Sequence, residues 1–112
     1  MQKIIEKMAE IVEKRIKHYK DDFYKYDIES LNSGESSVYV WAVRSCGTWL
    51  MTAENLKNGN SKEMYESLYN SNVSALQRGD KRIHKFFIVD IKNQTVKEVR
   101  KDKSYAEICK MF

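Results

Sequence analysis

An amphipathic helix is predicted over residues 2–20. Apolar side chains recur there at spacings of three and four, which places them on one stripe of a 3.6-residue period. Glu10 and Lys14 form an acid-before-base pair at i, i+4, and this orientation supports a helix. The stripe consists of Ile5, Met8, Val12, Ile16 and Tyr19.

The period changes over Asp21–Leu31. Tyr24, Tyr26 and Ile28 alternate with polar residues, and a period of two is typical of a β-strand. A continued helix is the alternative, because Phe23 and Tyr26 would then extend the earlier apolar stripe. We predict a strand here, since the turn-rich NSGESS segment follows it.

Two further strands are predicted over Ser36–Arg44 and Thr48–Thr52. The first is apolar at both parities, which is typical of a central strand covered on both faces. We interpret residues 45–47 as a three-residue hairpin loop with Gly47 in the left-handed position. That register pairs Val43 with Trp49 and Trp41 with Met51.

The second half of the chain adds two helices and a hairpin. Residues 54–60 are expected to be a loop, and a helix is expected to run from a capping box at Asn60 to Gly79. Strands follow over 82–92 and 95–101, the latter a lysine-guarded edge, and a short helix over 104–111 closes the chain. The buried stripe expected for the long helix is Met64, Tyr65, Leu68, Val73 and Leu76.

The predicted fold is therefore a single α+β domain over residues 1–112. Its elements follow the order α-βββ-α-ββ-α, with a largely antiparallel sheet of four to five strands and helices packed on it. No apolar run is long enough for a membrane span, and the charged N-terminus does not resemble a signal peptide. We expect a soluble, cytoplasmic protein, monomeric or homodimeric, with its two cysteines reduced.

The positive charge is concentrated in the C-terminal half. Residues 1–56 contain eight Lys or Arg and nine Asp or Glu, whereas residues 57–112 contain twelve and seven. Cations beside aromatic rings are able to bind a nucleic-acid backbone and its bases, and His84 and Phe86 lie within the basic stretch. The neighbouring Lys97 and Lys103 extend the group. The candidate cations for binding a partner or nucleic acid are Arg78, Lys81, Arg82, Lys85, Arg100 and Lys101.

Seven tyrosines and two tryptophans indicate a protein interface, because these residues often anchor such surfaces. We expect Tyr65 and Tyr69 to serve as anchors. The expected partner is a host protein such as a nuclease or its nucleic-acid complex, and direct binding of DNA or RNA is the alternative.

A cysteine-dependent enzyme at Cys46 is a second alternative. A reactive thiol needs a base or a helix N-terminus, and His18 and His84 are the histidines of the chain. Cys46, Cys109 and these histidines lack the spacing of a metal site, and the glycines do not form a phosphate loop. The sequence therefore predicts no metal site, no cofactor and no catalytic residue.

The segments DFYKYD and YVWAVRSCGTWL, within residues 22–52, resemble small accessory proteins of phages and mobile elements in low-GC Gram-positive bacteria. The composition, rich in lysine, asparagine, isoleucine and tyrosine, fits that resemblance. Some such proteins are anti-CRISPR or other anti-defence inhibitors. The resemblance therefore implies a non-enzymatic inhibitor that occludes a host nucleic-acid-handling enzyme, and it assigns no functional residue.

Overall fold

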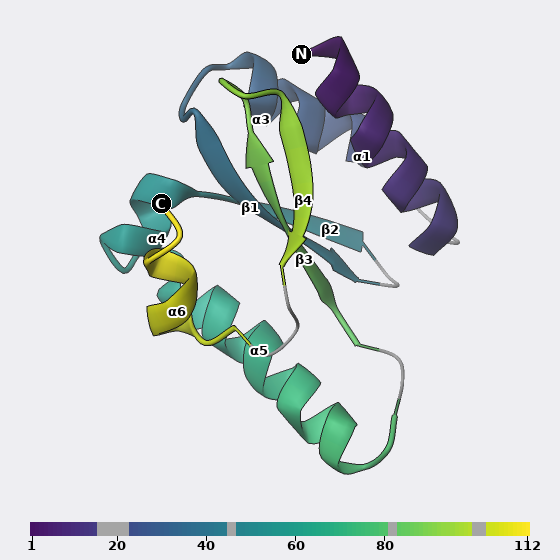
Figure 1. Cartoon of the computed structure of the whole chain (residues 1–112), viewed down its shortest axis with the longest axis vertical. Helices are drawn as coiled ribbons and strands as arrows, with labels where there is room; N and C mark the ends of the chain where they lie inside the picture. The colour runs from purple at the N-terminus through teal and green to yellow at the C-terminus, as the bar shows by residue number, and fades with distance from the viewer. Residues whose placement is uncertain (16–22, 45–46, 81–82, 100–102) are drawn as a thin grey trace.

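The computed structural model describes residues 1–15, 23–44, 47–80, 83–99 and 103–112 (Figure 1). Four strands form one antiparallel sheet in the order β2-β1-β3-β4. The strands are β1 (Val38–Arg44), β2 (Gly47–Thr52), β3 (Lys85–Asp90) and β4 (Thr95–Val99). The helices are α1 (Gln2–Arg15), the π-helix η1 (Phe23–Asp27), α3 (Ile28–Asn32), α4 (Ala53–Lys57), α5 (Lys62–Gln77) and α6 (Tyr105–Cys109).

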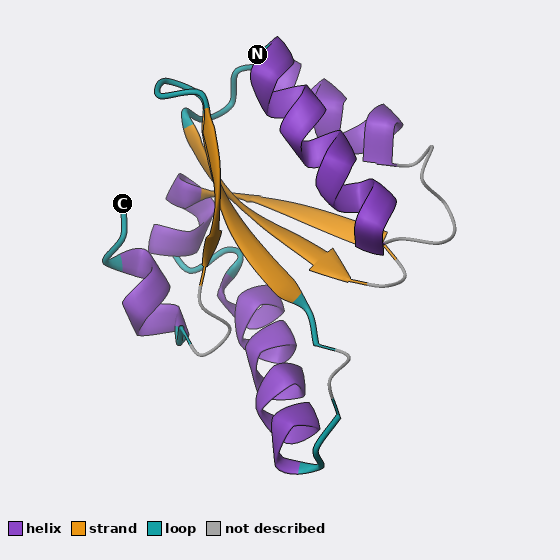
Figure 2. Cartoon of the chain, turned by 45° about the vertical axis from the view of Figure 1, so that its right-hand side comes forward, coloured by secondary structure: helices purple, strands orange, loops and turns teal. Residues whose placement is uncertain are grey.

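The sheet is the middle of three layers, with α1, η1 and α3 on one face and α4, α5 and α6 on the other (Figure 2). Trp41 and Phe87 carry the first interface, where their rings lie 5.7 Å apart beneath α1. Tyr65 of α5 and Phe86 of β3 carry the second, with ring centroids 4.9 Å apart. Each face of the sheet therefore has its own apolar core.

The predicted α+β class, the antiparallel sheet and the central position of β1 are confirmed. Every residue from Tyr39 to Val43 is buried, as expected for a strand with helices on both faces. β4 is an edge strand, as its lysine content predicted. The short helix predicted over 104–111 is present as α6. It begins with a capping box, in which the Ser104 hydroxyl accepts from the Glu107 amide and the Glu107 carboxylate accepts from the Ser104 amide.

The strand predicted over residues 21–31 is wrong, because the described part of this segment is helical. Asp27 and Leu31 are both buried, and a spacing of four brings them to the same face of a helix. Tyr26, which an amphipathic strand would have buried, is 57% exposed. The alternation of apolar and polar residues does not decide the structure here. The buried carboxylate of Asp27 instead accepts hydrogen bonds from the Trp41 indole and the Thr48 hydroxyl.

The hairpin register predicted for β1 and β2 is wrong by one residue. Arg44 pairs with Gly47, so Gly47 begins β2 instead of completing a three-residue loop. Trp41 consequently lies opposite Leu50, and Trp49 lies opposite Ala42. A shift of one residue moves a side chain to the other face of a sheet. Trp49 is therefore absent from the Trp41 core and is 44% exposed.

Two details of the second half also differ from the prediction. Residues 53–57 form the short helix α4, because Thr52 caps it by accepting the Asn55 amide hydrogen bond at 3.0 Å. The long helix begins at Lys62 without the capping box expected at Asn60. Its termination near Gly79 is confirmed. Its buried stripe is Tyr65, Leu68, Asn72 and Ala75, and Leu76 is exposed.

Candidate binding groove

The charges of α1 are sorted around the helix. Lys3, Lys7 and Lys14 lie at spacings of four and seven, so they share one side of the apolar stripe. These lysines line pockets that α1 forms with β3 and β4. Although the N-terminal half has a net charge of −1, these three lysines form a row of positive charges along one side of α1.

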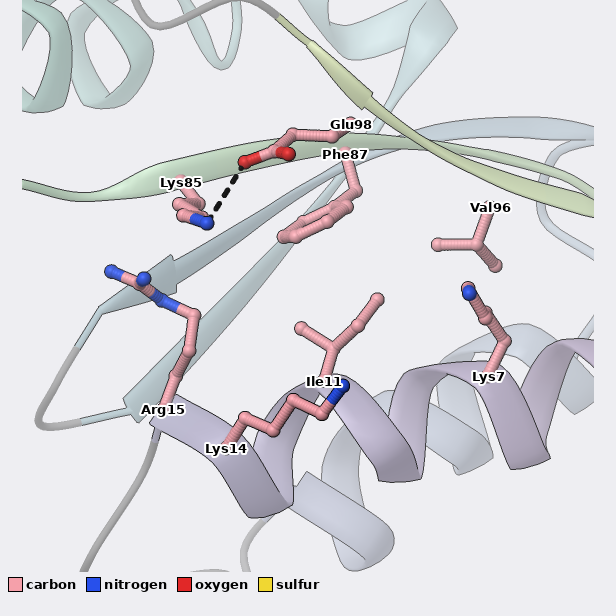
Figure 3. A pocket seen from close by; sticks show the side chains of 8 residues that line it. All are labelled: Lys7, Ile11, Lys14, Arg15, Lys85, Phe87, Val96 and Glu98. Atoms are coloured by element: carbon pink, nitrogen blue, oxygen red, sulfur yellow. Dashed lines mark ion pairs between the residues drawn. The ribbon is translucent and has the colours of Figure 1, made fainter.

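A pocket of about 450 Å³ opens between α1 and the strands β3 and β4. Four cations come from two directions, three of them from α1 and Lys85 from β3 (Figure 3). Apolar side chains lie between the cationic ends, and the Glu98 carboxylate is paired with the Lys85 ammonium at 3.2 Å. The lining residues are Lys7, Ile11, Lys14, Arg15, Lys85, Phe87, Val96 and Glu98.

A second pocket of about 350 Å³ continues along the same helix. It shares Lys7 and Val96 with the first pocket, so the two hollows form one groove between α1 and the edge strand. We call this surface the basic groove. Its charged residues are Lys3, Lys7, Lys14, Arg15, Lys85, Lys97 and Glu98.

The wide end of the basic groove is fixed by a long-range hydrogen bond. The Arg15 guanidinium donates through Nη2 to the carbonyl oxygen of Ile83 at 2.7 Å. Among the described residues the Nε of Arg15 has no hydrogen-bond partner. The last turn of α1 is thereby joined to the chain that enters β3, and the guanidinium is held at the pocket wall.

The segment that enters β3 is also held from α5, by the buried side-chain amide of Asn72. Asn72 of α5 is 1% exposed, and its side chain accepts from the His84 amide at 2.7 Å and donates to the His84 carbonyl at 2.9 Å. A buried amide that forms both bonds imposes a single position on the chain beside it. Residues 83 and 84 are therefore fixed between α1 and α5.

His84 is adapted to remain neutral. Burial lowers the pKa of the imidazole below its ordinary value, and the nearby positive charges of Arg44 and Arg15 lower it further. His84 therefore adds little positive charge to this end of the groove near neutral pH. The charge there comes from the arginines and lysines.

Of the cations predicted from the sequence, Lys85 lines the basic groove. The neighbouring Lys97 lies at its edge and also lines a hollow on the opposite face of the sheet, beside Ile88 and Met111. Arg78 does not line the groove, because it caps the C-terminal end of α5, which projects beyond the sheet (Figure 1). Lys103 pairs with Glu107 of α6 at 3.7 Å, on the other side of the sheet. Lys81, Arg82, Arg100 and Lys101 lie outside the described residues, as do His18 and Cys46.

The aromatic anchors are placed differently from the prediction. Tyr65 is completely buried and donates its hydroxyl hydrogen bond to the Lys103 carbonyl at 2.6 Å. Phe86 is also buried, so neither ring is available to a partner in the folded protein. Tyr69 is half-buried against the α5 core. Tyr65 and Phe86 therefore belong to the core on that face of the sheet, and the role expected of Tyr69 stays a prediction.

No three His, Cys, Asp or Glu side chains of the described residues gather as a metal site would require. No helix within the described ranges combines the length and the apolar character needed to cross a membrane.

Comparison of the chain with protein-family models, with curated proteins and with solved structures found no match in any of the three. The basic groove is thus defined by the chemistry of its own residues. Sequence reasoning missed the contribution of α1 because a summed charge hides which side of a helix each residue occupies. The spacing of Lys3, Lys7 and Lys14 was the available signal.

Proposed function

We propose that this protein is a non-enzymatic binding protein that occludes a host protein by docking an acidic part of its surface in the basic groove. The observation that carries the proposal is the convergence of the α1 cations and Lys85 on one pocket. Cations from two separate elements are able to contact one anionic segment from both sides.

The composition of the groove favours a protein partner over a nucleic-acid backbone. Its floor is apolar at Ile11 and Val96, and protein interfaces combine an apolar centre with a polar rim. Glu98 stands in the same wall, with its side chain 53% exposed. This carboxylate is paired with Lys85 and still has acceptor capacity for a donor group of a protein partner.

The expected target is a cytoplasmic enzyme that handles nucleic acid, such as a defence nuclease. This part of the proposal rests on the resemblance of residues 22–52 to accessory proteins of phages and mobile elements. A basic inhibitor is suited to such enzymes because their nucleic-acid channels often neighbour acidic catalytic residues. Inhibition is then expected to be stoichiometric.

Direct binding of DNA or RNA is the second candidate. The row of Lys3, Lys7 and Lys14 favours it, because the first and last of these residues are separated by about 16 Å along a helix with a 1.5 Å rise per residue. A strand bound there would lose affinity steeply as salt increases, since each phosphate contact releases counterions.

The cysteine-dependent alternative makes a separate prediction. Cys46 lies outside the described residues. If Cys46 were a nucleophile, Cys46→Ala would abolish function and preserve the fold. The binding proposal expects Cys46→Ala to retain the partner.

The proposal is tested by affinity capture from nuclease-treated bacterial extract. The bait is the wild-type protein, with the double variant Lys7→Glu/Lys14→Glu and the matched variant Lys57→Glu/Lys110→Glu beside it. The control lysines are exposed and lie on α4 and the end of α6, on the other side of the sheet. We expect the wild type and the control to retain one protein at equal stoichiometry, and the groove variant to lose it.

Two results would contradict the proposal. Capture that disappears after nuclease treatment would show that nucleic acid, and not protein, is the ligand. Equal capture by the wild type and the groove variant would remove the basic groove from the interface.

A further inference from the structure

We propose that the wide pocket of the basic groove is a binding site for a nucleoside phosphate. The site is the 450 Å³ hollow between α1 and the strands β3 and β4 (Figure 3). This inference concerns a small ligand and does not depend on the proposed protein partner.

The charge of the pocket suits several phosphate groups. Lys7, Lys14, Arg15 and Lys85 supply four positive charges, and Glu98 supplies one negative charge, which leaves a surplus of three. A single carboxylate would leave most of this surplus without a counter-charge, whereas a di- or triphosphate matches it. Lysine and arginine are the side chains that proteins use most for phosphate groups.

The apolar part of the pocket suits a planar base. Ile11 and Val96 lie between the cations at the two ends and are partly exposed, whereas Phe87 is 6% exposed and adds little accessible surface (Figure 3). The volume falls within the range of about 300–1,000 Å³ that is common for small-ligand sites. A ligand consisting only of phosphate would leave this apolar surface in contact with water, so the full lining favours a ligand with an apolar body as well.

Glu98 has a defined task in this arrangement. Its carboxylate is paired with the Lys85 ammonium (Figure 3), and Glu98 is the cross-strand neighbour of Phe87. A sugar occupies the corresponding position between the phosphates and the base of a nucleotide. An ionised carboxylate accepts hydrogen bonds, and it is therefore suited to the ribose hydroxyls.

Two contacts hold the cationic end before any ligand arrives. Arg15 is held by the Ile83 carbonyl at 2.7 Å, and Lys85 is held by Glu98 at 3.2 Å. Side chains that are already ordered lose less entropy when a ligand binds. Lys14 extends from α1 along the pocket, whereas Lys7 lies at the opposite end beside Val96 (Figure 3).

The experiment is a calorimetric titration of the purified chain with ATP and with GTP, without divalent cations. Adenosine and sodium triphosphate are titrated separately, because they represent the two halves of the ligand. We expect at least one nucleotide to bind about tenfold more tightly than either half. Lys14→Gln and Arg15→Gln should each weaken nucleotide binding about tenfold, and the matched variant Lys110→Gln should leave it unchanged. Lys14 makes the more robust test, because Arg15 also supports the fold.

Several outcomes would overturn the inference. Triphosphate that binds as tightly as the nucleotides would indicate a general polyanion site, in which the apolar floor has no role. Tighter binding of a 5′-phosphorylated single strand would assign the pocket to the end of a nucleic acid. Absence of binding by every probe, or an equal loss in Lys110→Gln, would also contradict it. A protein that captures its partner but fails these titrations would lose this inference and keep the proposed function.

Discussion

Arg15 donates a hydrogen bond from Nη2 to the carbonyl oxygen of Ile83, and this 2.7 Å contact joins residues 68 positions apart in the chain. It places a guanidinium from the end of α1 beside the first residue of β3, Lys85. The basic groove therefore exists only in the folded chain, because its cations come from segments that local sequence does not connect.

Replacing Arg15 should affect both the fold and the groove. Arg15→Gln removes the charge and the bond to Ile83, and loss of a hydrogen bond from a charged group should lower the free energy of unfolding by about 1.5–3 kcal/mol. Arg15→Lys keeps the charge but not the planar donor, so it should lower the free energy of unfolding by less than Arg15→Gln does. Denaturant unfolding measures both. Equal stability of all three proteins would show that the contact has no energetic role.

The amide of Asn72 should be among the most sensitive polar positions of the protein. Asn72→Ala leaves the partly buried His84 amide and carbonyl without their side-chain partner, which should lower the free energy of unfolding by about 2–4 kcal/mol for the two groups. Asn70→Ala is the control, because Asn70 is exposed on the same helix. Urea unfolding compares the two variants. If Asn72→Ala lowers the free energy of unfolding as little as Asn70→Ala does, the two hydrogen bonds to His84 do not stabilise the fold.

Asp27 should make stability depend on pH in an unusual direction. Burial raises the pKa of this carboxyl above its ordinary value, although hydrogen bonds from Thr48 and Trp41 oppose the shift. The folded protein therefore binds this proton more tightly than the unfolded chain does. The contribution of Asp27 to stability is complete below the unfolded pKa and is lost as pH rises through the folded pKa.

Asp27→Asn provides the measurement, because asparagine keeps an acceptor for both donors and does not ionise. The difference in unfolding free energy between this variant and the wild type should shift in favour of the variant as pH increases from acidic to neutral. All other titrating groups contribute equally to both proteins and cancel. A difference that stays constant across this range would show that burial does not shift the pKa of Asp27.

The substitution Tyr65→Phe distinguishes a structural role of this residue from a role in partner binding. Tyr65→Phe removes only the hydrogen bond to the Lys103 carbonyl and should lower stability by about 1 kcal/mol. Partner capture should be unchanged, because the ring is completely buried. Thermal unfolding and affinity capture test the two statements. Weaker capture by a fully folded Tyr65→Phe protein would restore Tyr65 to the interface.

The sequence predicted an element correctly where a whole segment shared one pattern, and it failed where the prediction depended on a single residue. The apolar run of β1 and the polar, basic sequence of residues 95–101 correctly predicted a central and an edge strand. The register of β1 and β2 depended on one residue of loop length, and this small error moved Trp49 to the opposite face.

Residues 23–32 show a different limit. Their alternation favours a strand, but Asp27 makes its hydrogen bonds with Trp41 and Thr48, which are 14 and 21 residues away. Local periodicity does not contain that information, so tertiary contacts decided the helical state. The basic groove escaped prediction for the same reason, since Lys14 and Lys85 meet only after α1 packs beside the sheet.

The most direct test of the basic groove is the affinity of the captured partner for three purified proteins. These are the wild type, Lys7→Glu/Lys14→Glu and Lys57→Glu/Lys110→Glu, each first shown to unfold with the same midpoint. Reversal of two charges in the groove should weaken binding at least tenfold, and reversal of two charges on the opposite side of the sheet should change it little. Equal affinity of the first two proteins, or an equal loss in the third, would contradict a binding site between α1 and β4.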